Sequence, residues 1–107
     1  HADGGRLLVA LRRWLEQKSW WDTVDMLSMV VGEIIPALGA LPQMDAWIRD
    51  PCVWVRRCAL ICQIKQRTKT DTRRLFEYCE RCSDEKEFFI AKAIGWALRA
   101  HARVEPK

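Results

Sequence analysis

Two tryptophans and two aspartates stand within seven residues at positions 19–25, which read Ser-Trp-Trp-Asp-Thr-Val-Asp. Ser19, followed three residues later by Asp22, resembles a capping box, so we expect a helix to begin here. On that helix Asp25 lies one turn after Trp21, at the edge of an apolar stripe. A carboxylate beside an indole offers a negative charge next to an aromatic face, which is more than a structural helix needs. We therefore take Trp21 and Asp25 as candidate site residues.

Five cysteines raise the question of a metal site. Three stand near helical spacing, and Cys79 and Cys82 form a single C-x-x-C pair. A zinc site would need a second well-spaced pair or nearby histidines, whereas His1 and His101 stand near the two ends of the chain. We expect buried thiols, no metal and no other cofactor. A zinc-stabilised helical domain is an alternative that metal analysis would settle.

The composition indicates one small basic domain. The 107 residues are 50% hydrophobic, and 18 Lys and Arg against 14 Asp and Glu give a net charge of +4. The excess favours a polyanionic partner without proving one. No run approaches the roughly 18 apolar residues of a membrane span, and no signal peptide opens the chain, so we expect a cytoplasmic protein without membrane contact. Because the chain begins at His1 and not at Met, we expect a fragment or a processed form.

Apolar spacing along the chain predicts six helices and few strands. The expected helices are residues 6–18, 19–35, 43–49, 51–67, 71–82 and 85–103. Asp50 with Pro51 predicts the fourth helix start, Asp71 caps the fifth, and Ser83 with Asp84 caps the sixth. Successive helices are expected to pair as hairpins. The predicted hairpins of the single domain 1–107 span residues 6–35, 43–67 and 71–103.

The hairpins also show a weak internal repeat. Residues 54–59 and 89–94 match in type at a spacing of 35, and Trp20 precedes Trp54 by 34. A period in the mid-thirties with two helices per unit is typical of HEAT-like repeats. The predicted fold is therefore an all-α HEAT-like solenoid of three helical hairpins, and an irregular helical bundle is the alternative.

The second helices of stacked pairs line one surface, which is usually the concave binding face. In this chain those helices carry charged and aromatic residues: Trp21, Asp25, Arg57, Lys92, Trp96, Arg99 and Arg103. The segment after the fourth helix adds cations that could reach phosphates at the rim: Lys65, Arg67, Lys69, Arg73 and Arg74. Each residue alone also has a structural interpretation, in the core, at a helix end or on a solvated face. Their coincidence on one predicted face favours a binding surface.

At these residues the chain resembles the AlkD-type DNA glycosylases, HEAT-like repeat proteins that excise alkylated purines from DNA. The resemblance rests on residues 19–25, 54–59, 65–71 and, above all, Glu-Phe-Phe-Ile-Ala-Lys-Ala-Ile-Gly-Trp-Ala-Leu-Arg at 87–99, and it covers residues 19–106. It implies that Asp25 is the catalytic aspartate, that Trp21 and Trp96 flank the lesion, and that Arg57 contacts DNA. We also assign Lys65, Arg67, Lys69, Lys92, Arg99 and Arg103 to DNA binding.

The resemblance implies monofunctional hydrolysis of the N-glycosidic bond of N3- or N7-alkylated purines in duplex DNA. Such a purine is cationic and leaves as a neutral base, so it needs no general acid. Positive charge develops on the deoxyribose, where a carboxylate such as Asp25 can stabilise it and orient the attacking water. The indoles can hold the cationic nucleotide by about 1 to 2 kcal/mol where water is excluded. The resemblance further implies recognition without a base-flipping pocket.

Members of that family carry further repeats before the Ser-Trp-Trp stretch and a further segment after the position of Pro106. This sequence has neither, so we expect weaker DNA binding and an exposed apolar solenoid end. We expect Leu7, Leu11 and Trp14 to shield that end only in part and copies of the chain to associate there. The alternative function is a non-catalytic HEAT-like module that binds DNA or protein through its basic face.

Overall fold

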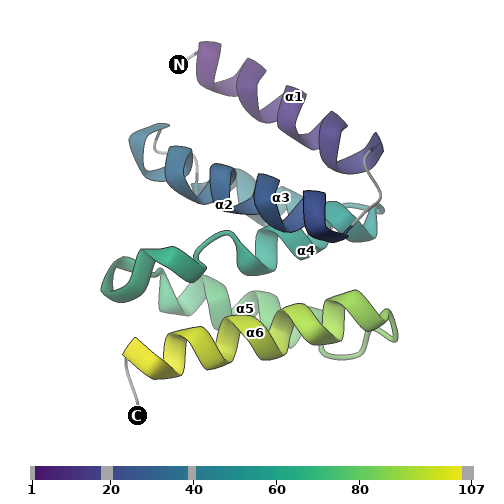
Figure 1. Cartoon of the computed structure of the whole chain (residues 1–107), viewed down its shortest axis with the longest axis vertical. Helices are drawn as coiled ribbons and strands as arrows, with labels where there is room; N and C mark the ends of the chain where they lie inside the picture. The colour runs from purple at the N-terminus through teal and green to yellow at the C-terminus, as the bar shows by residue number, and fades with distance from the viewer. Residues whose placement is uncertain (1, 18–20, 39–40, 105–107) are drawn as a thin grey trace.

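Six α-helices and two short 3-10 helices make up the fold of this chain in a computed structural model, which describes residues 2–17, 21–38 and 41–104 (Figure 1). The helices are α1 Ala2–Gln17, α2 Trp21–Leu38, η1 Leu41–Gln43, α3 Met44–Trp47, α4 Val53–Ile61, η2 Ile64–Lys69, α5 Thr72–Cys82 and α6 Phe88–Val104. No strand occurs within these ranges. The predicted all-α class with three pairs of helices is therefore confirmed.

The helical pairs stack in chain order along the long axis of the molecule, from α1 at one end to α5 and α6 at the other (Figure 1). Helix α2 packs against α1 and α4, and α4 packs in turn against α6. The second helices of the three pairs thus form a continuous row, as a solenoid requires. Any side chains that point the same way from this row can share one surface.

Helix α2 contributes its predicted apolar stripe to the core. Val24 and Val31 are fully buried and Leu27 nearly so, while Ile35 takes the buried place at the end of the stripe and Ile34 is only partly covered. The expected stripe member Trp20 lies outside the described residues. Ser28, on the adjacent stripe, is also buried, and its hydroxyl donates to the Val24 carbonyl at 2.7 Å. That bond satisfies the hydroxyl inside the apolar interface.

Helix α4 ends at Ile61, six residues before its expected end, and the chain continues as η2. The polar side chains that follow bond to distant main chain instead of extending the helix. Gln63 accepts from the Asp71 amide at 2.7 Å, and Gln66 donates to the Gly32 carbonyl at 2.6 Å. These bonds give the backbone an alternative to the helical ladder. As a result, η2 is fastened to both α2 and the start of α5.

Two expected helix starts are also wrong by a few residues. Helix α4 begins at Val53 and not at Pro51, because the Asp50 carboxylate accepts from the Cys52 amide at 2.9 Å and holds the chain in a turn first. Helix α6 begins at Phe88 and not at residue 85. Ser83 caps the end of α5 instead, where its hydroxyl donates to the Glu80 carbonyl at 2.8 Å. By contrast, the expected Asp71 cap of α5 is confirmed, since its carboxylate accepts from the Arg74 amide at 3.1 Å.

Helix α1 covers the first end of the stack with one apolar face. Leu8, Leu11 and Leu15 are buried against the rest of the core. Of the three residues expected to shield this end, Leu11 does so from the inward face of α1. Trp14 and Leu7 point outward and remain about half exposed.

Candidate functional site

Three of the predicted site residues meet where the second helices lie side by side. Asp25 comes from α2, Arg57 from α4 and Trp96 from α6. The Arg57 guanidinium donates to both carboxylate oxygens of Asp25, from Nε at 2.8 Å and from Nη2 at 3.0 Å. Its central carbon lies 5.9 Å from the centre of the Trp96 ring. The sequence prediction that these residues share one surface agrees with this geometry.

Arg57 is buried deeply for a charged residue. Only 5% of it is exposed, and its remaining terminal nitrogen, Nη1, donates to the Phe89 carbonyl at 2.6 Å in the first turn of α6. All three sides of the guanidinium therefore have acceptors, which is the condition for burying an arginine at acceptable cost. Arg57 acts as a cross-link between the three pairs, and a direct DNA contact by this residue stays a prediction.

Asp25 sits at the rim and not in the core. Its side chain keeps 18% of its surface exposed, whereas that of Arg57 keeps 6%. A carboxylate has about four lone-pair sites, and the arginine fork occupies two of them. Asp25 is thus held in a fixed orientation and still has acceptor capacity toward solvent. This arrangement suits a group that must present negative charge at a defined place.

Trp96 is partly buried and packs against the core from α6. Trp21 opens α2, so its backbone lies one turn before Asp25, but its side chain lies outside what the structure describes. The side chain of Arg67, within η2, is outside the described set as well. The roles predicted for Trp21 and Arg67 therefore stay predictions.

The other predicted DNA-binding cations occupy η2 and α6. All of them are exposed to solvent: Lys65, Lys69, Lys92, Arg99 and Arg103. The ammonium of Lys92 lies 5.1 Å from the centre of the Phe88 ring, close enough for a cation–π interaction. Exposure leaves these charges available to a polyanion, and their assignment to DNA stays a prediction.

An aromatic cluster that the sequence did not predict lies beside the site. Trp54 of α4 lies 4.8 Å from Phe89 between ring centres, and Phe89 lies 5.3 Å from Phe88. Trp54 and Phe89 occupy equivalent places in the two repeats matched at a spacing of 35. That match is the sequence feature from which their contact could have been predicted. The carbonyl of Phe89 accepts a hydrogen bond from Arg57, and the ring of Phe89 packs in the cluster. The cluster therefore holds in place one of the acceptors of Arg57.

The neighbouring Arg56 has a structural role. Its guanidinium bonds to Glu85 at 2.8 and 3.0 Å and to the Asp50 carbonyl at 2.7 Å. These contacts tie the start of α4 to the connection before α6. Of the two adjacent arginines, only Arg57 faces the row of second helices and Asp25.

Four of the cysteines lie in the core. Burial raises the pKa of Cys58 and Cys82 to about 12 and that of Cys79 to about 11, and it holds the pKa of Cys62 well above its usual range. The thiols are therefore protonated at neutral pH and are poor metal ligands in that form. Among the residues that the structure describes, no three His, Cys, Asp or Glu side chains gather as a metal site would require.

A second charged network lies away from the site, between α3 and α5. Arg74 pairs with Asp45 at 3.1 Å and with Asp71 at 2.9 Å, and the Tyr78 hydroxyl donates to Asp45. Hydrogen bonding from Arg74 lowers the pKa of Asp45, and the Arg74 amide together with its guanidinium lowers that of Asp71. Burial and the bond to Asp45 raise the pKa of Tyr78. This network fastens α5 to the second pair and shares no residue with the Asp25 ion pair.

Within the described ranges, every helix is too short or too polar to cross a bilayer.

Comparison with known proteins gives two positive findings. The family model described as "DNA alkylation repair enzyme" matches residues 3–107. A solved structure described as a predicted DNA alkylation repair enzyme from Enterococcus faecalis is 33% identical, with a TM-score of 0.88. The alignment covers 95% of this chain and 49% of that one, so the chain spans about half the length of this structure. No curated protein matches the chain significantly.

Proposed function

Because the chain belongs to the DNA alkylation repair enzyme family, we propose that it is a DNA glycosylase for cationic N3- and N7-alkylated purines. The observation that carries this proposal is the convergence of Asp25, Arg57 and Trp96 from three successive helical pairs. A positioned carboxylate, held by an arginine that lies over the Trp96 ring, matches a reaction in which positive charge grows on a sugar. The HEAT-like character of the repeats and the duplex DNA substrate are parts of the same proposal.

In the proposed reaction the alkylated base is already a good leaving group. The bond between the sugar and the base nitrogen breaks, the electron pair leaves with the neutral base, and the sugar becomes an oxocarbenium-like cation. The Asp25 carboxylate stabilises this charge and accepts a hydrogen bond from the attacking water. The water oxygen bonds to the sugar carbon, and its proton passes to solvent or to Asp25.

Arg57 acts in this proposal mainly as an orienting residue. Its fork holds both oxygens of Asp25, and the Phe89 carbonyl holds the fork. A fixed carboxylate loses little freedom on the way to the transition state. The positive charge of Arg57 also offsets the negative charge of Asp25, so the carboxylate can stabilise a cationic sugar only at short distance. Trp96, and Trp21 by prediction, supply faces for the cationic nucleotide.

A base-release assay tests the proposal. The chain is incubated with duplex DNA that holds a single 7-methylguanine, and the free base is measured by chromatography against the spontaneous loss without protein. We expect release above that background and little release with Asp25→Asn. If both proteins leave the base in place, this chain does not carry the activity. The cytoplasmic location predicted from the sequence belongs to the same proposal.

A non-catalytic module that binds DNA or protein is the second candidate. It is favoured by the hydrogen bond that Arg57 donates to each Asp25 oxygen, an arrangement that a purely structural ion pair would also show. This candidate predicts salt-dependent binding to duplex DNA with no preference for lesions and no base release. Binding to matched duplexes with and without 7-methylguanine separates the two functions.

We also propose that copies of the chain associate through the outer face of α1. Val9 and Trp14 are more than half exposed there, with Leu7 beside them. Arg6 and Arg13 line the same groove and repel their counterparts on a second copy, so added salt should strengthen the association. Sedimentation across a range of protein and salt concentrations tests this. A monomer at every concentration contradicts it.

A further inference from the structure

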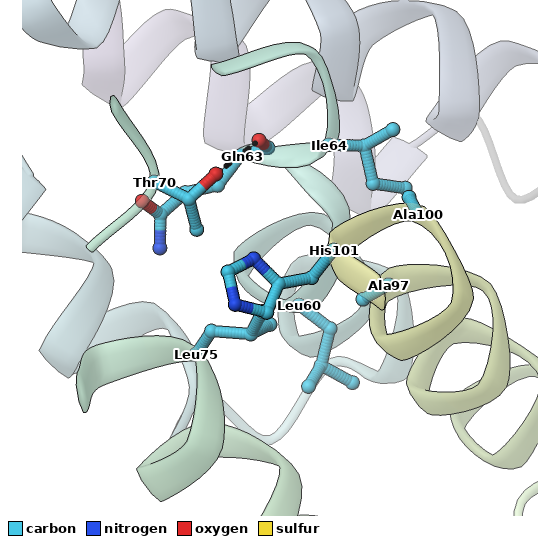
Figure 2. A pocket seen from close by; sticks show the side chains of 8 residues that line it. All are labelled: Leu60, Gln63, Ile64, Thr70, Leu75, Ala97, Ala100 and His101. Atoms are coloured by element: carbon cyan, nitrogen blue, oxygen red, sulfur yellow. Dashed lines mark hydrogen bonds between the residues drawn. The ribbon is translucent and has the colours of Figure 1, made fainter. Parts of the chain in front are cut away.

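A small cavity between η2 and α6 is lined by both apolar and polar groups (Figure 2). The apolar lining comes mainly from Leu60, Leu75, Ala97 and Ala100. The polar lining comes from Gln63, Thr70 and His101. An apolar void would stay dry, whereas polar groups that converge on a void can hold water. The polar lining is therefore the feature to explain.

His101 is the least satisfied of these groups. Its Nδ1 atom is buried and has no hydrogen-bond partner. Figure 2 shows the imidazole entering the cavity from α6, with Nδ1 on the side of Thr70 and Gln63 and with Leu75 and Leu60 toward the opposite edge. Either tautomer of a neutral imidazole leaves Nδ1 as a donor or an acceptor that needs a partner. A buried nitrogen of this kind rarely goes without one.

The groups opposite His101 have spare hydrogen-bonding capacity. The Thr70 hydroxyl donates to the Gln63 carbonyl over a long 3.5 Å, which leaves its oxygen lone pairs to accept. The Gln63 side-chain amide donates one hydrogen to the Asp71 carbonyl at 3.4 Å and has a second hydrogen to give. A single small molecule placed between them could therefore meet three polar partners.

The space has the size of one water. About 10 Å³ of the cavity is open to the centre of a water molecule, which is close to the least that holds one. A hydrated cation or a larger ligand would have to extend beyond this volume. The ligand that matches both the size and the mixture of donors and acceptors is water.

We propose that this cavity binds one structural water, through which His101 fastens to α6 the two residues that flank η2, Gln63 and Thr70. The water joins Nδ1 of His101 to Thr70 and to the Gln63 amide. Gln63 and Gln66 already tie η2 to α5 and α2 through direct bonds. The water supplies the third attachment, to the helix that carries Trp96. His101 is thereby a positioning residue for η2.

The consequence for binding rests on the proposed function. Segment η2 carries Lys65 and Lys69, both exposed. If η2 is held against α6, these lysines keep a fixed offset from the Asp25 site, so less freedom is lost when they meet a phosphate backbone. The water site itself does not depend on DNA, and it can be tested without DNA.

Hydrogen exchange of the backbone amides of residues 64–70 tests the attachment. His101→Asn keeps a polar atom near the place of Nδ1, and His101→Leu keeps bulk without polarity. We expect His101→Asn to exchange within about twofold of the unmodified protein and His101→Leu to exchange about tenfold faster, since the loss of one hydrogen-bonded link changes local opening by that order. If His101→Leu protects the segment as well as His101→Asn does, His101 acts by packing and the proposal is wrong. Equal loss in both variants also overturns it.

Phe76→Leu is the matched control, because Phe76 packs on the His101 ring at 5.8 Å without contributing a polar group. It should leave the exchange of η2 unchanged. A crystal structure of the unmodified chain gives a second test that needs no variant. A density peak within hydrogen-bond distance of His101 Nδ1 and Thr70 Oγ1 supports the proposal, and an empty cavity refutes it. If the unmodified chain holds the water and His101→Leu binds DNA more weakly, the water site also supports DNA binding. If the affinity of His101→Leu is unchanged, the proposed effect on DNA binding is wrong and the water site still stands.

Discussion

Arg57 grips both carboxylate oxygens of Asp25 across 32 residues of sequence, and its third nitrogen reaches the Phe89 carbonyl a further 32 residues along. One guanidinium thus joins the second helices of all three pairs. A ligand that approaches this surface meets an ion pair and not an isolated carboxylate. In the proposed mechanism, the effect of Asp25 therefore depends on how Arg57 divides its hydrogen bonds and charge between Asp25 and the ligand.

The first prediction concerns the catalytic role of Asp25. Asp25→Asn keeps the shape of the side chain and removes its charge, so we expect base release from 7-methylguanine DNA to fall by about 10² to 10³, the usual loss for a key electrostatic group. Glu33→Gln is the matched control, because Glu33 is an exposed carboxylate two turns further along α2. Single-turnover release measures both variants. Full activity in Asp25→Asn would remove Asp25 from the mechanism.

The second prediction concerns the ion pair as a structural element. Arg57→Met keeps most of the buried side-chain length but leaves Asp25 and the Phe89 carbonyl without their donor. Because Asp25 stays partly exposed, we expect a loss of about 3 kcal/mol in the free energy of unfolding, at the low end for breaking a buried pair. Urea unfolding of Arg57→Met, Asp25→Asn and the double variant measures the coupling. Additive losses would mean that the two residues do not stabilise each other.

The convergence of Asp25, Arg57 and Trp96 was predictable from sequence, because helix periodicity and repeat order place them on the second helices. Their pairing was not, since it depends on how far one helix is offset along the next. The early end of α4 could not be predicted either, because it also depends on contacts between distant residues. Gln63 and Gln66 end the helix through bonds to Asp71 and to the Gly32 carbonyl, and helix propensity contains no information about such distant partners.

The third prediction concerns the basic residues as a DNA surface. Lys65→Ala and Lys69→Ala should each weaken binding to any duplex and reduce the slope of log affinity against log salt by about one. Lys86→Ala is the control, since Lys86 is an exposed lysine in the connection between α5 and α6. Fluorescence anisotropy at several salt concentrations provides the slopes. An unchanged slope in both η2 variants would place the DNA elsewhere.

The fourth prediction concerns acid stability. In the Arg74 network, Asp45 and Asp71 have pKa values below their usual 3.8 in the folded state. Groups with a lowered pKa stabilise the fold fully above the unfolded value and lose that contribution as pH falls through the folded value. We therefore expect unfolding free energy to fall with pH below about 4. Arg74→Met should flatten this dependence, and a slope as steep as that of the unmodified chain would show that other carboxylates cause it.

The fifth prediction concerns the contact between α2 and the end of α4. A Cβ on Gly32 would overlap the main-chain carbonyl oxygen of Cys62, which cannot move without shifting η2. Gly32→Ala should therefore destabilise the fold by about 1 to 3 kcal/mol despite the higher helix propensity of alanine. At Gly95 the same Cβ would lie 3.0 Å from the guanidinium of Arg99, whose flexible side chain can yield.

Gly95→Ala is therefore the matched control, and we expect it to be neutral or stabilising by up to about 1 kcal/mol. Urea unfolding measures both variants. Because Gly32 also supplies the carbonyl that accepts from Gln66, Gly32→Ala should in addition loosen η2 and weaken DNA binding, which Gly95→Ala should not do through this route. If the two variants are equally stable, the Cys62 carbonyl does not lie close enough to Gly32 to exclude a Cβ, and the argument for Gly32 is wrong.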